Sequence, residues 1–244
     1  MKYLALAIAI CIASVSLAET HVDLSSQFNT DMQQFLFGTN FPLGNTDVNV
    51  AGVGFHLGTL GGDPNTLGAM ERPYNSNSNF TAIISGLNIA VQGPTSLYTL
   101  IDEQFGRDGS YLGYVTVYGS HGESTTMQLV SGANVGNNWT AGFVTTLTDP
   151  SVQVQYYRNG QPTTTVDSET MAFYRQELAL PSSFIGDTVT SMKYVGFNNG
   201  DVNLGDGVFA AATFNTSNIC ICPEPASMAA LGVGICAFLR RKKR

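Results

Sequence analysis

The sequence predicts an all-β protein whose body is a single β-sandwich, and three observations support that prediction. Short runs of Val, Ile, Leu, Tyr and Phe alternate with Gly, Asn, Thr and Ser, a texture typical of strands and turns. Almost no segment of the body combines a capping residue with the 3.6-residue periodicity of a helix. The body between residues 19 and 219 contains no cysteine. We therefore expect two sheets around a single hydrophobic core that packing alone holds together.

Nine strands are expected at short spacing along the body, and their order is 48–57, 79–84, 96–102, 112–118, 125–130, 152–157, 169–180, 189–197 and 209–214. The clearest hairpin joins residues 114–118 to residues 124–130. Both flanks alternate in polarity, and the connection 119–123 carries two glycines. Residues 25–37 are compatible with one or two helical turns, and residues 29–41 equally with an irregular edge.

The N-terminal residues 1–18 have the pattern of a secretory signal peptide. Lys2 precedes an apolar stretch, and the small residues Ser16 and Ala18 end it. This pattern predicts cleavage after Ala18 by signal peptidase, so that the mature chain begins at Glu19.

The C-terminal residues contain three parts in a fixed order. Pro223, Glu224 and Pro225 come first, fourteen uncharged residues follow, and Arg240, Arg241 and three further basic residues end the chain. As a helix the uncharged run would reach ~21 Å, less than the ~30 Å of a bilayer core. The basic cluster predicts that the end of this helix stays on the cytoplasmic side. A simple tail anchor is one interpretation.

The order of these parts resembles the PEP-CTERM sorting signal of Gram-negative-type bacteria, which an exosortase recognises. The resemblance covers residues 223–244 and implies membrane association through the apolar helix, processing near the Pro-Glu-Pro triplet, and a surface or extracellular destination. It divides the chain into a signal peptide (1–18), a body (19–219) and a sorting segment (220–244). Because proteins with this signal share no single activity, the resemblance implies a sorting pathway but no biochemical reaction.

The body resembles the exported bacterial β-sandwiches of galactose-binding-like, jelly-roll type. Residues 53–57 resemble the strand that opens such a domain, residues 96–101 its central strand, and residues 209–214 the strand that closes the sheet. The hairpin 111–130 and the segments 174–181 and 189–195 resemble its later strands. The resemblance implies glycan binding in many such domains and a structural calcium ion in some.

The charge of the body excludes one class of partner. Between Glu19 and Cys222 five basic residues face 17 acidic ones, a formal charge of −12. Such a surface has no counter-charge for phosphates, so we expect no binding to nucleic acid.

Residues that could carry out catalysis are few. His21, His56 and His121 lie at no metal-ligand spacing from one another, and no Gly-x-Ser-x-Gly motif is present. Asp102 and Glu103 are adjacent on an expected strand, so their side chains should point to opposite faces. We therefore expect no enzyme, and a secreted hydrolase is a remote alternative.

Two groups of residues could bind a ligand. Trp139, Asn134, Asn138 and Tyr114 combine aromatic rings with amides, as a glycan site requires, although a single Trp is also typical of a sandwich core. Asp201, Asn203 and Asp206 resemble a calcium loop, but Gly205 displaces Asp206 by one position and Ala212 stands where an acidic ligand is needed. We expect no metal or cofactor, and these three residues would be the ligands if calcium did bind.

These observations predict a non-catalytic surface or extracellular-matrix protein that a C-terminal signal sorts after export. The alternative is a glycan-binding module of the cell surface or biofilm matrix, with exopolysaccharide as its partner. Signal peptidase and exosortase are the partners expected during export.

Overall fold

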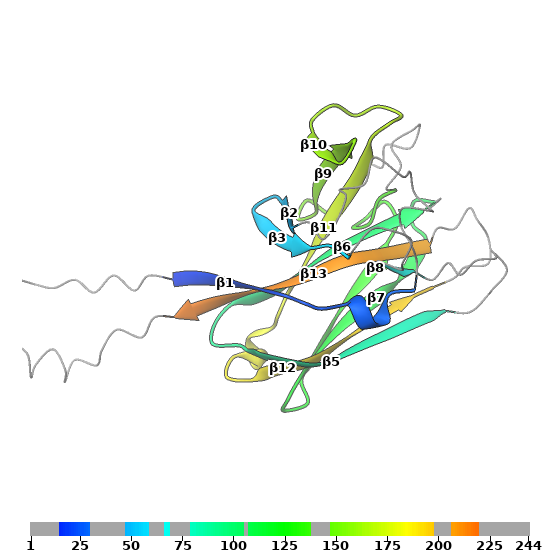
Figure 1. Ribbon diagram of the computed structural model, residues 1–244. Coiled ribbons are helices and arrows are strands. Elements are labelled where there is room, and N and C mark those ends of the chain that lie inside the picture. The colour runs from blue at the N-terminus through cyan, green and yellow to red at the C-terminus, as the bar shows by residue number, and fades with distance from the viewer. Residues whose placement is uncertain are drawn as a thin grey trace, which may run out of the picture.

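The computed structural model describes residues 15–29, 47–58, 66–68, 79–104, 107–137, 147–197 and 206–219. Figure 1 shows that strands dominate these ranges, with the single-turn 3-10 helices η1 (Ser25–Gln27) and η2 (Ser182–Phe184). The strands are β1 (Val15–His21), β2 (Asp47–Val50), β3 (Val53–His56), β4 (Leu67–Gly68), β5 (Phe80–Ala90), β6 (Thr95–Gln104), β7 (Tyr111–Gly119), β8 (Ser124–Val130), β9 (Gln153–Arg158), β10 (Gln161–Thr163), β11 (Met171–Ala179), β12 (Thr188–Gly196) and β13 (Asp206–Ile219).

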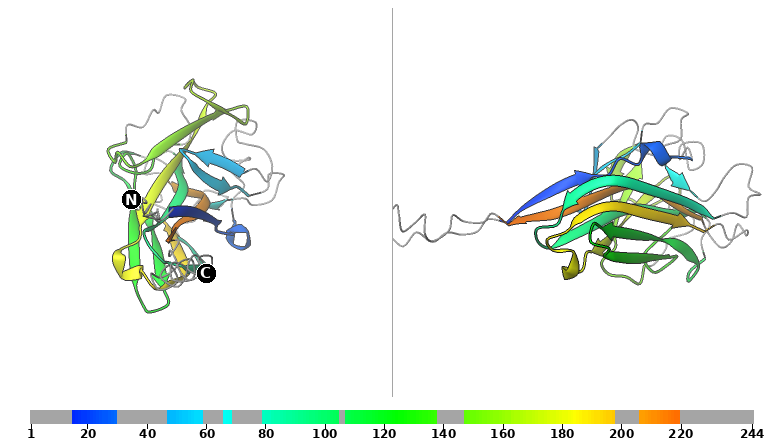
Figure 2. Two further views of the ribbon diagram at one scale, coloured as in Figure 1. Left: turned by 90° about the vertical axis from the view of Figure 1, so that its left-hand side faces the viewer. Right: turned by 90° about the horizontal axis from the view of Figure 1, so that it is seen from below.

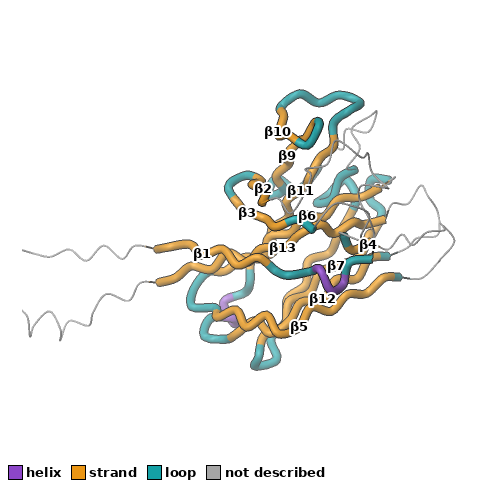
Figure 3. The backbone as a smooth tube through the Cα atoms, viewed as in Figure 1, coloured by secondary structure: helices purple, strands orange, loops and turns teal. Residues whose placement is uncertain are grey.

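Two antiparallel sheets form the sandwich. The larger sheet has the order β1-β13-β6-β11-β9-β10 with β4 attached to β13, and the smaller has the order β5-β12-β7-β8. The four-strand sets β1-β13-β6-β11 and β5-β12-β7-β8 have the strand order of a jelly-roll-like sandwich. Figure 3 shows long strands joined by shorter loops. The prediction of an all-β sandwich is confirmed.

Apolar side chains from both sheets meet between them. On β7, Val115 and Val117 are fully buried, while Tyr114 and Tyr118 alternate with them and are less buried. On β12, Val189, Met192 and Tyr194 enter the same core, and a bulge between Val189 and Ser191 shifts the alternation once. The largest side chains of this core include Tyr194, Phe184, Phe209, Phe214, Leu97 and Leu67.

A second core lies on the other face of the larger sheet, so the prediction of a single core is wrong. Its members include Val50, Phe55, Leu100, Tyr157 and Phe173, from β2, β3, β6, β9 and β11. Apolar residues on both faces of central strands require a cover on each side, because an exposed apolar face is unfavourable. The smaller sheet covers one face and the β2–β3 hairpin covers part of the other.

The β2–β3 hairpin corrects two predictions. Residues 48–57 form two strands with a turn at Ala51 and Gly52, both with positive φ, where Asn49 Oδ1 accepts a hydrogen bond from the Gly52 N–H. This pair is a separate two-stranded sheet, so residues 53–57 do not open the sandwich as expected. Arg175 fixes the turn by donating to the carbonyl of Ala51 at 2.7 Å.

Strands β6 and β11 pair only along part of their length. Their ladder ends at Leu100 and Arg175, beyond which β11 pairs with β9 alone. Two buried side chains replace the missing backbone bonds. Asp102 Oδ1 accepts from the Tyr174 N–H at 3.0 Å, and the Gln176 amide bonds both the N–H and the C=O of Ile101. The separation lets β9, β10 and β11 rise from the sandwich in the upper part of Figure 1.

The first and last described residues lie side by side at one end of the molecule. Val15 of β1 pairs with Ile219 of β13, and both views of Figure 2 show the two strands adjacent. We call this end proximal and the opposite end distal. The loop before Thr188 is also proximal, because Val91 bonds Asp187 and Thr95 pairs with Thr216.

Strand β1 was not among the expected strands. Its first four residues precede the predicted signal cleavage point after Ala18, and they pair with Thr216–Ile219. The sequence interpretation assigned these residues to the signal peptide alone. Strands β4 and β10 were also not expected.

A search for membrane-crossing helices within the described ranges finds none that is long and apolar enough. The uncharged run of the expected sorting helix, residues 226–239, lies outside those ranges.

Truncation of Phe214 should test the sandwich core. The Phe214 side chain is fully buried between the sheets, so Phe214→Ala should lower the free energy of unfolding by about 3–5 kcal/mol. Ile83 is 56% exposed, and Ile83→Ala should change it by about 0.5 kcal/mol or less. Urea denaturation of both variants measures this, and equal losses would contradict the described packing.

Candidate functional site

The acidic pair at the distal end of β6 is enclosed by the fold. Glu103 is 1% exposed, and its Oε1 accepts a hydrogen bond from the Ser131 hydroxyl at 2.8 Å. Burial raises the pKa of Glu103 to about 7, against the stabilising hydrogen bond from Ser131, and the Asp108 carboxylate raises it further. Burial therefore favours the protonated form of the Glu103 side chain.

Asp102 is fully buried and contacts a different segment. Its Oδ1 accepts from the Tyr174 backbone, while its Oδ2 has no hydrogen-bond partner. Burial raises the pKa of Asp102 well above its usual range. Because Asp102 and Glu103 accept from donors on different elements and are closed from solvent, they do not form an open carboxylate pair of the kind that glycosidases use.

Loop 131–137 fills the gap where β6 and β11 separate. The Glu103 N–H donates to the Gly136 carbonyl, and Tyr174 Oη donates to the Asn137 carbonyl. Asn134, a predicted glycan contact, closes the turn after β8: its Oδ1 accepts from the Val130 N–H and its Nδ2 donates to the Gln128 carbonyl. The structure thus uses the Asn134 amide to shape the backbone. Asn138 and Trp139 lie outside the described residues.

Tyr114 belongs to an aromatic patch that we define by Tyr111, Tyr114 and Phe197. Both tyrosine rings contact Phe197, with centroids 5.2 Å and 6.1 Å away. Lys193 Nζ lies 5.8 Å from the Tyr114 ring centroid, and the exposed Gln128 is the cross-strand partner of Tyr114. Tyr114 alternates with core residues along β7, so the patch is on the outer face of the smaller sheet, near its distal end. The sequence identified Tyr114 alone.

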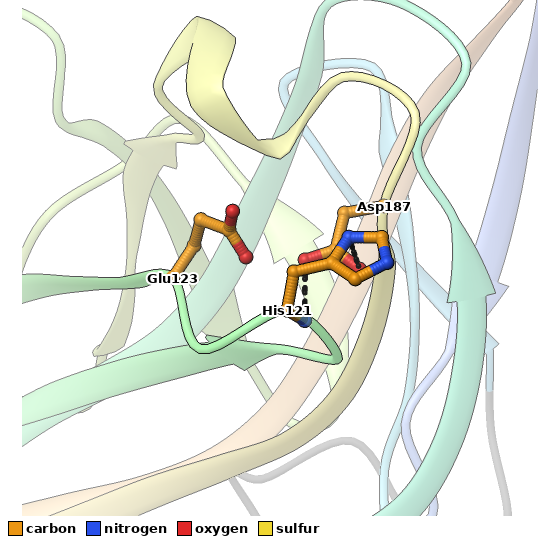
Figure 4. A group of neighbouring side chains, drawn as sticks. All are labelled: His121, Glu123 and Asp187. Atoms are coloured by element: carbon orange, nitrogen blue, oxygen red, sulfur yellow. Dashed lines mark hydrogen bonds and ion pairs between the residues drawn. The ribbon is translucent and has the colours of Figure 1, made fainter.

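A second group, His121, Glu123 and Asp187, gathers at the proximal end, as Figure 4 shows. His121 and Glu123 belong to the connection between β7 and β8, and Asp187 immediately precedes β12. One potential ligand atom from each residue lies within 4.8 Å of the others. His121 Nδ1 is 3.2 Å from Asp187 Oδ1, with the imidazole 69% exposed and the Asp187 carboxylate 2% exposed.

Donors to both carboxylate oxygens hold Asp187 in its ionised form: the Ser120 hydroxyl and the Thr188 N–H donate to Oδ1, and the His121 N–H donates to Oδ2. The Ser120 hydroxyl, followed by the backbone N–H groups of Thr188 and His121, keeps the pKa of Asp187 well below its usual range. Gly119 allows this approach, because a Cβ there would lie 2.1 Å from Asp187 Oδ2 and 3.2 Å from Glu123 Oε2. Sequence reasoning missed this group, since Asp187 is 64 residues from Glu123 and no local spacing links them.

Of the three residues predicted as calcium ligands, the structure describes only Asp206. Asp201 and Asn203 lie outside the described residues, and Asp206 begins β13 opposite Gln104. His56 lies on β3, where its Nδ1 is 2.8 Å from the exposed Asp47 and its ring centroid is 6.5 Å from that of His21.

Comparison with known protein families identifies one segment. Residues 222–244 match the family described as the PEP-CTERM protein-sorting motif. This match contains all five sorting residues named above, Pro223, Glu224, Pro225, Arg240 and Arg241, which lie outside the described ranges. Neither the curated proteins nor the solved structures include a significant match to this chain. The likeness of the body to galactose-binding-like domains therefore stays a prediction. The C-terminal segment therefore carries a PEP-CTERM protein-sorting motif, and this motif supports export and sorting by an exosortase.

The buried Glu103 should make stability depend on pH. In the folded protein the Glu103 carboxyl keeps its proton up to about pH 7. In the unfolded chain it releases the proton near its ordinary pKa of 4.5. The unfolded state then binds fewer protons between these values, so stability falls as pH rises through this window, by ~3 kcal/mol for this group. Because glutamine cannot ionise, the stability of Glu103→Gln should not show the decrease with rising pH that Glu103 causes.

Urea midpoints of the wild type and Glu103→Gln at pH 5 and pH 8 measure the difference. The variant should gain stability relative to the wild type as the pH rises. An identical pH dependence of the two proteins would show that Glu103 is not held protonated by the fold.

Proposed function

We propose that this protein is a non-catalytic component of the cell surface or extracellular matrix, which the PEP-CTERM motif delivers after export. The observation that carries the proposal is the position of the motif. Only residues 220 and 221 separate Ile219, the end of β13, from the matched segment. The sandwich is therefore joined to its sorting signal by a link of less than about 10 Å.

The order of residues at the proximal end supports a non-catalytic body. Ser120, His121 and Asp187 are the residue types of a hydrolytic triad, but the Ser120 hydroxyl donates to Asp187 and not to the imidazole. A Ser-His-Asp triad needs the His between the other two, where it can take the serine proton. The buried Asp102 and Glu103 also accept hydrogen bonds from the protein itself, from the Tyr174 N–H and from the Ser131 hydroxyl.

Processing should remove both ends of the chain. In cells with an active exosortase, the intact mass should correspond to a chain that begins at Glu19 and lacks Arg240–Arg244. Replacing Glu224 with Ala should leave the basic end in place and keep the protein in the membrane fraction. A mature surface form that retains Met1 or Arg244 in such cells would contradict the proposal.

Glycan binding is the second candidate, and the aromatic patch favours it. Sugar rings stack on exposed aromatic faces, and polar groups at the rim orient them. Tyr111 is 37% exposed beside Phe197, while Lys193 and Gln128 supply a cation and an amide near Tyr114. The patch lies near the distal end, away from the sorting segment, where a ligand outside the cell would be reached.

Tyr118 offers a matched control for this patch. Tyr111 and Tyr118 are both 37% exposed on β7, but Tyr118 lies at the proximal end of the strand. In affinity electrophoresis with exopolysaccharide, Tyr111→Ala and Tyr114→Ala should each reduce the retardation, and Tyr118→Ala should leave it unchanged. No retardation of the wild type, or equal losses in all three variants, would remove the case for a glycan site here.

A further inference from the structure

We propose that His121, Glu123 and Asp187 bind one divalent transition-metal ion, with Zn²⁺ the best chemical match, at the proximal end of the sandwich (Figure 4). The site would link the β7–β8 connection to the residue that precedes β12. The proposal is independent of the sorting route and of the aromatic patch.

The three side chains are close enough to share an ion. Their ligand atoms lie within 4.8 Å of one another. Zn²⁺ binds imidazole nitrogen and carboxylate oxygen at about 2.0–2.2 Å, so two ligands of one tetrahedral ion are roughly 3.3–3.6 Å apart. The group must therefore close by about 1 Å, a movement within reach of a side-chain rotation. The imidazole of His121 is 69% exposed, which leaves it room to rotate.

An unsatisfied buried oxygen points to a missing cation. Glu123 Oε2 is buried and has no hydrogen-bond donor within reach, and it lies with Asp187 Oδ2 around the position that a Cβ at residue 119 would occupy. Asp187 Oδ1 accepts from Ser120 and Thr188, whereas Oδ2 accepts only a long 3.3 Å bond from the His121 N–H. A cation shared by the two carboxylates would supply the partner that Glu123 Oε2 lacks.

Gly119 is a second sign that the space is shaped for these carboxylates. Any side chain at position 119 would collide with Asp187 Oδ2 and crowd Glu123 Oε2. The absence of a Cβ lets both oxygens approach the same point from opposite sides of the turn.

The donor set selects the kind of ion. One imidazole nitrogen with two carboxylates suits Zn²⁺ and its first-row neighbours, whereas Ca²⁺ requires six to eight oxygen ligands. Three protein ligands leave one position for water, which can enter because the imidazole is largely exposed. A bound ion would stabilise the folded state by mass action, because the unfolded chain does not bring residue 187 to the turn.

The test uses the full chain, purified without a histidine tag and with Cys220→Ser and Cys222→Ser, since a Cys-x-Cys pair also binds zinc. Isothermal titration with Zn²⁺ should give one site per chain, and Zn²⁺ should raise the melting temperature. Ca²⁺ at the same concentration should do neither. The absence of any zinc binding would overturn the proposal.

Variants then locate the ion. His121→Ala and Glu123→Gln should each weaken zinc binding by about tenfold or more. His56→Ala is the matched control, because His56 is another exposed histidine paired with an aspartate. Unchanged affinity in the first two variants, or loss of binding in His56→Ala, would overturn the assignment. Circular dichroism checks that each variant is folded.

X-ray absorption at the zinc edge of the protein with Cys220→Ser and Cys222→Ser gives a test that needs no variant at the site. One imidazole and otherwise oxygen ligands are expected. A spectrum with two imidazoles would place zinc at His21 and His56 and would overturn the assignment.

Discussion

The pairing of β13 with three other strands is the constraint on which the rest of the structure depends. β13 bonds β6 along one edge, and β1 and β4 along the other, and it contributes side chains to both large cores. A bulge between Phe209 and Ala211 makes this double use workable. The extra residue resets the alternation, so that Phe209 and Ala212 face the smaller sheet while Ala210 and Ala211 face the β2–β3 hairpin.

The two ends of the sandwich have different chemistry. The proximal end carries Val15 and Ile219, the first and last described residues, together with the His121, Glu123 and Asp187 group. The distal end carries the aromatic patch and loop 131–137. Antiparallel pairing of the first and last strands produces this division, because it brings the entry and exit of the chain to one place.

The features that depend on neighbouring residues were predicted from the sequence. The β7–β8 hairpin and the alternating strands were predicted because turn glycines and a period of two are properties of neighbouring residues. The turn at Ala51 and Gly52 was missed because apolar residues alternate on both sides of it, although the alternation shifts by one position between Val50 and Val53. The second core was not predicted, because a strand buried on both faces, such as β13, has a composition similar to that of a strand buried on one face. Asp187 joins His121 only through the register of β12 with β7, which one sequence does not encode locally.

The place of β13 also sets an order in time. Among the described strands β13 is synthesised last, and its partners β1, β4 and β6 are made much earlier. The contacts of the larger sheet therefore join residues far apart in the sequence, and the sheet cannot form until β13 has been made. Until residues 206–219 emerge, most of its central ladder has no partner. The larger sheet therefore closes only after residues 206–219 have been made, and until then β1 lacks the strand with which it pairs.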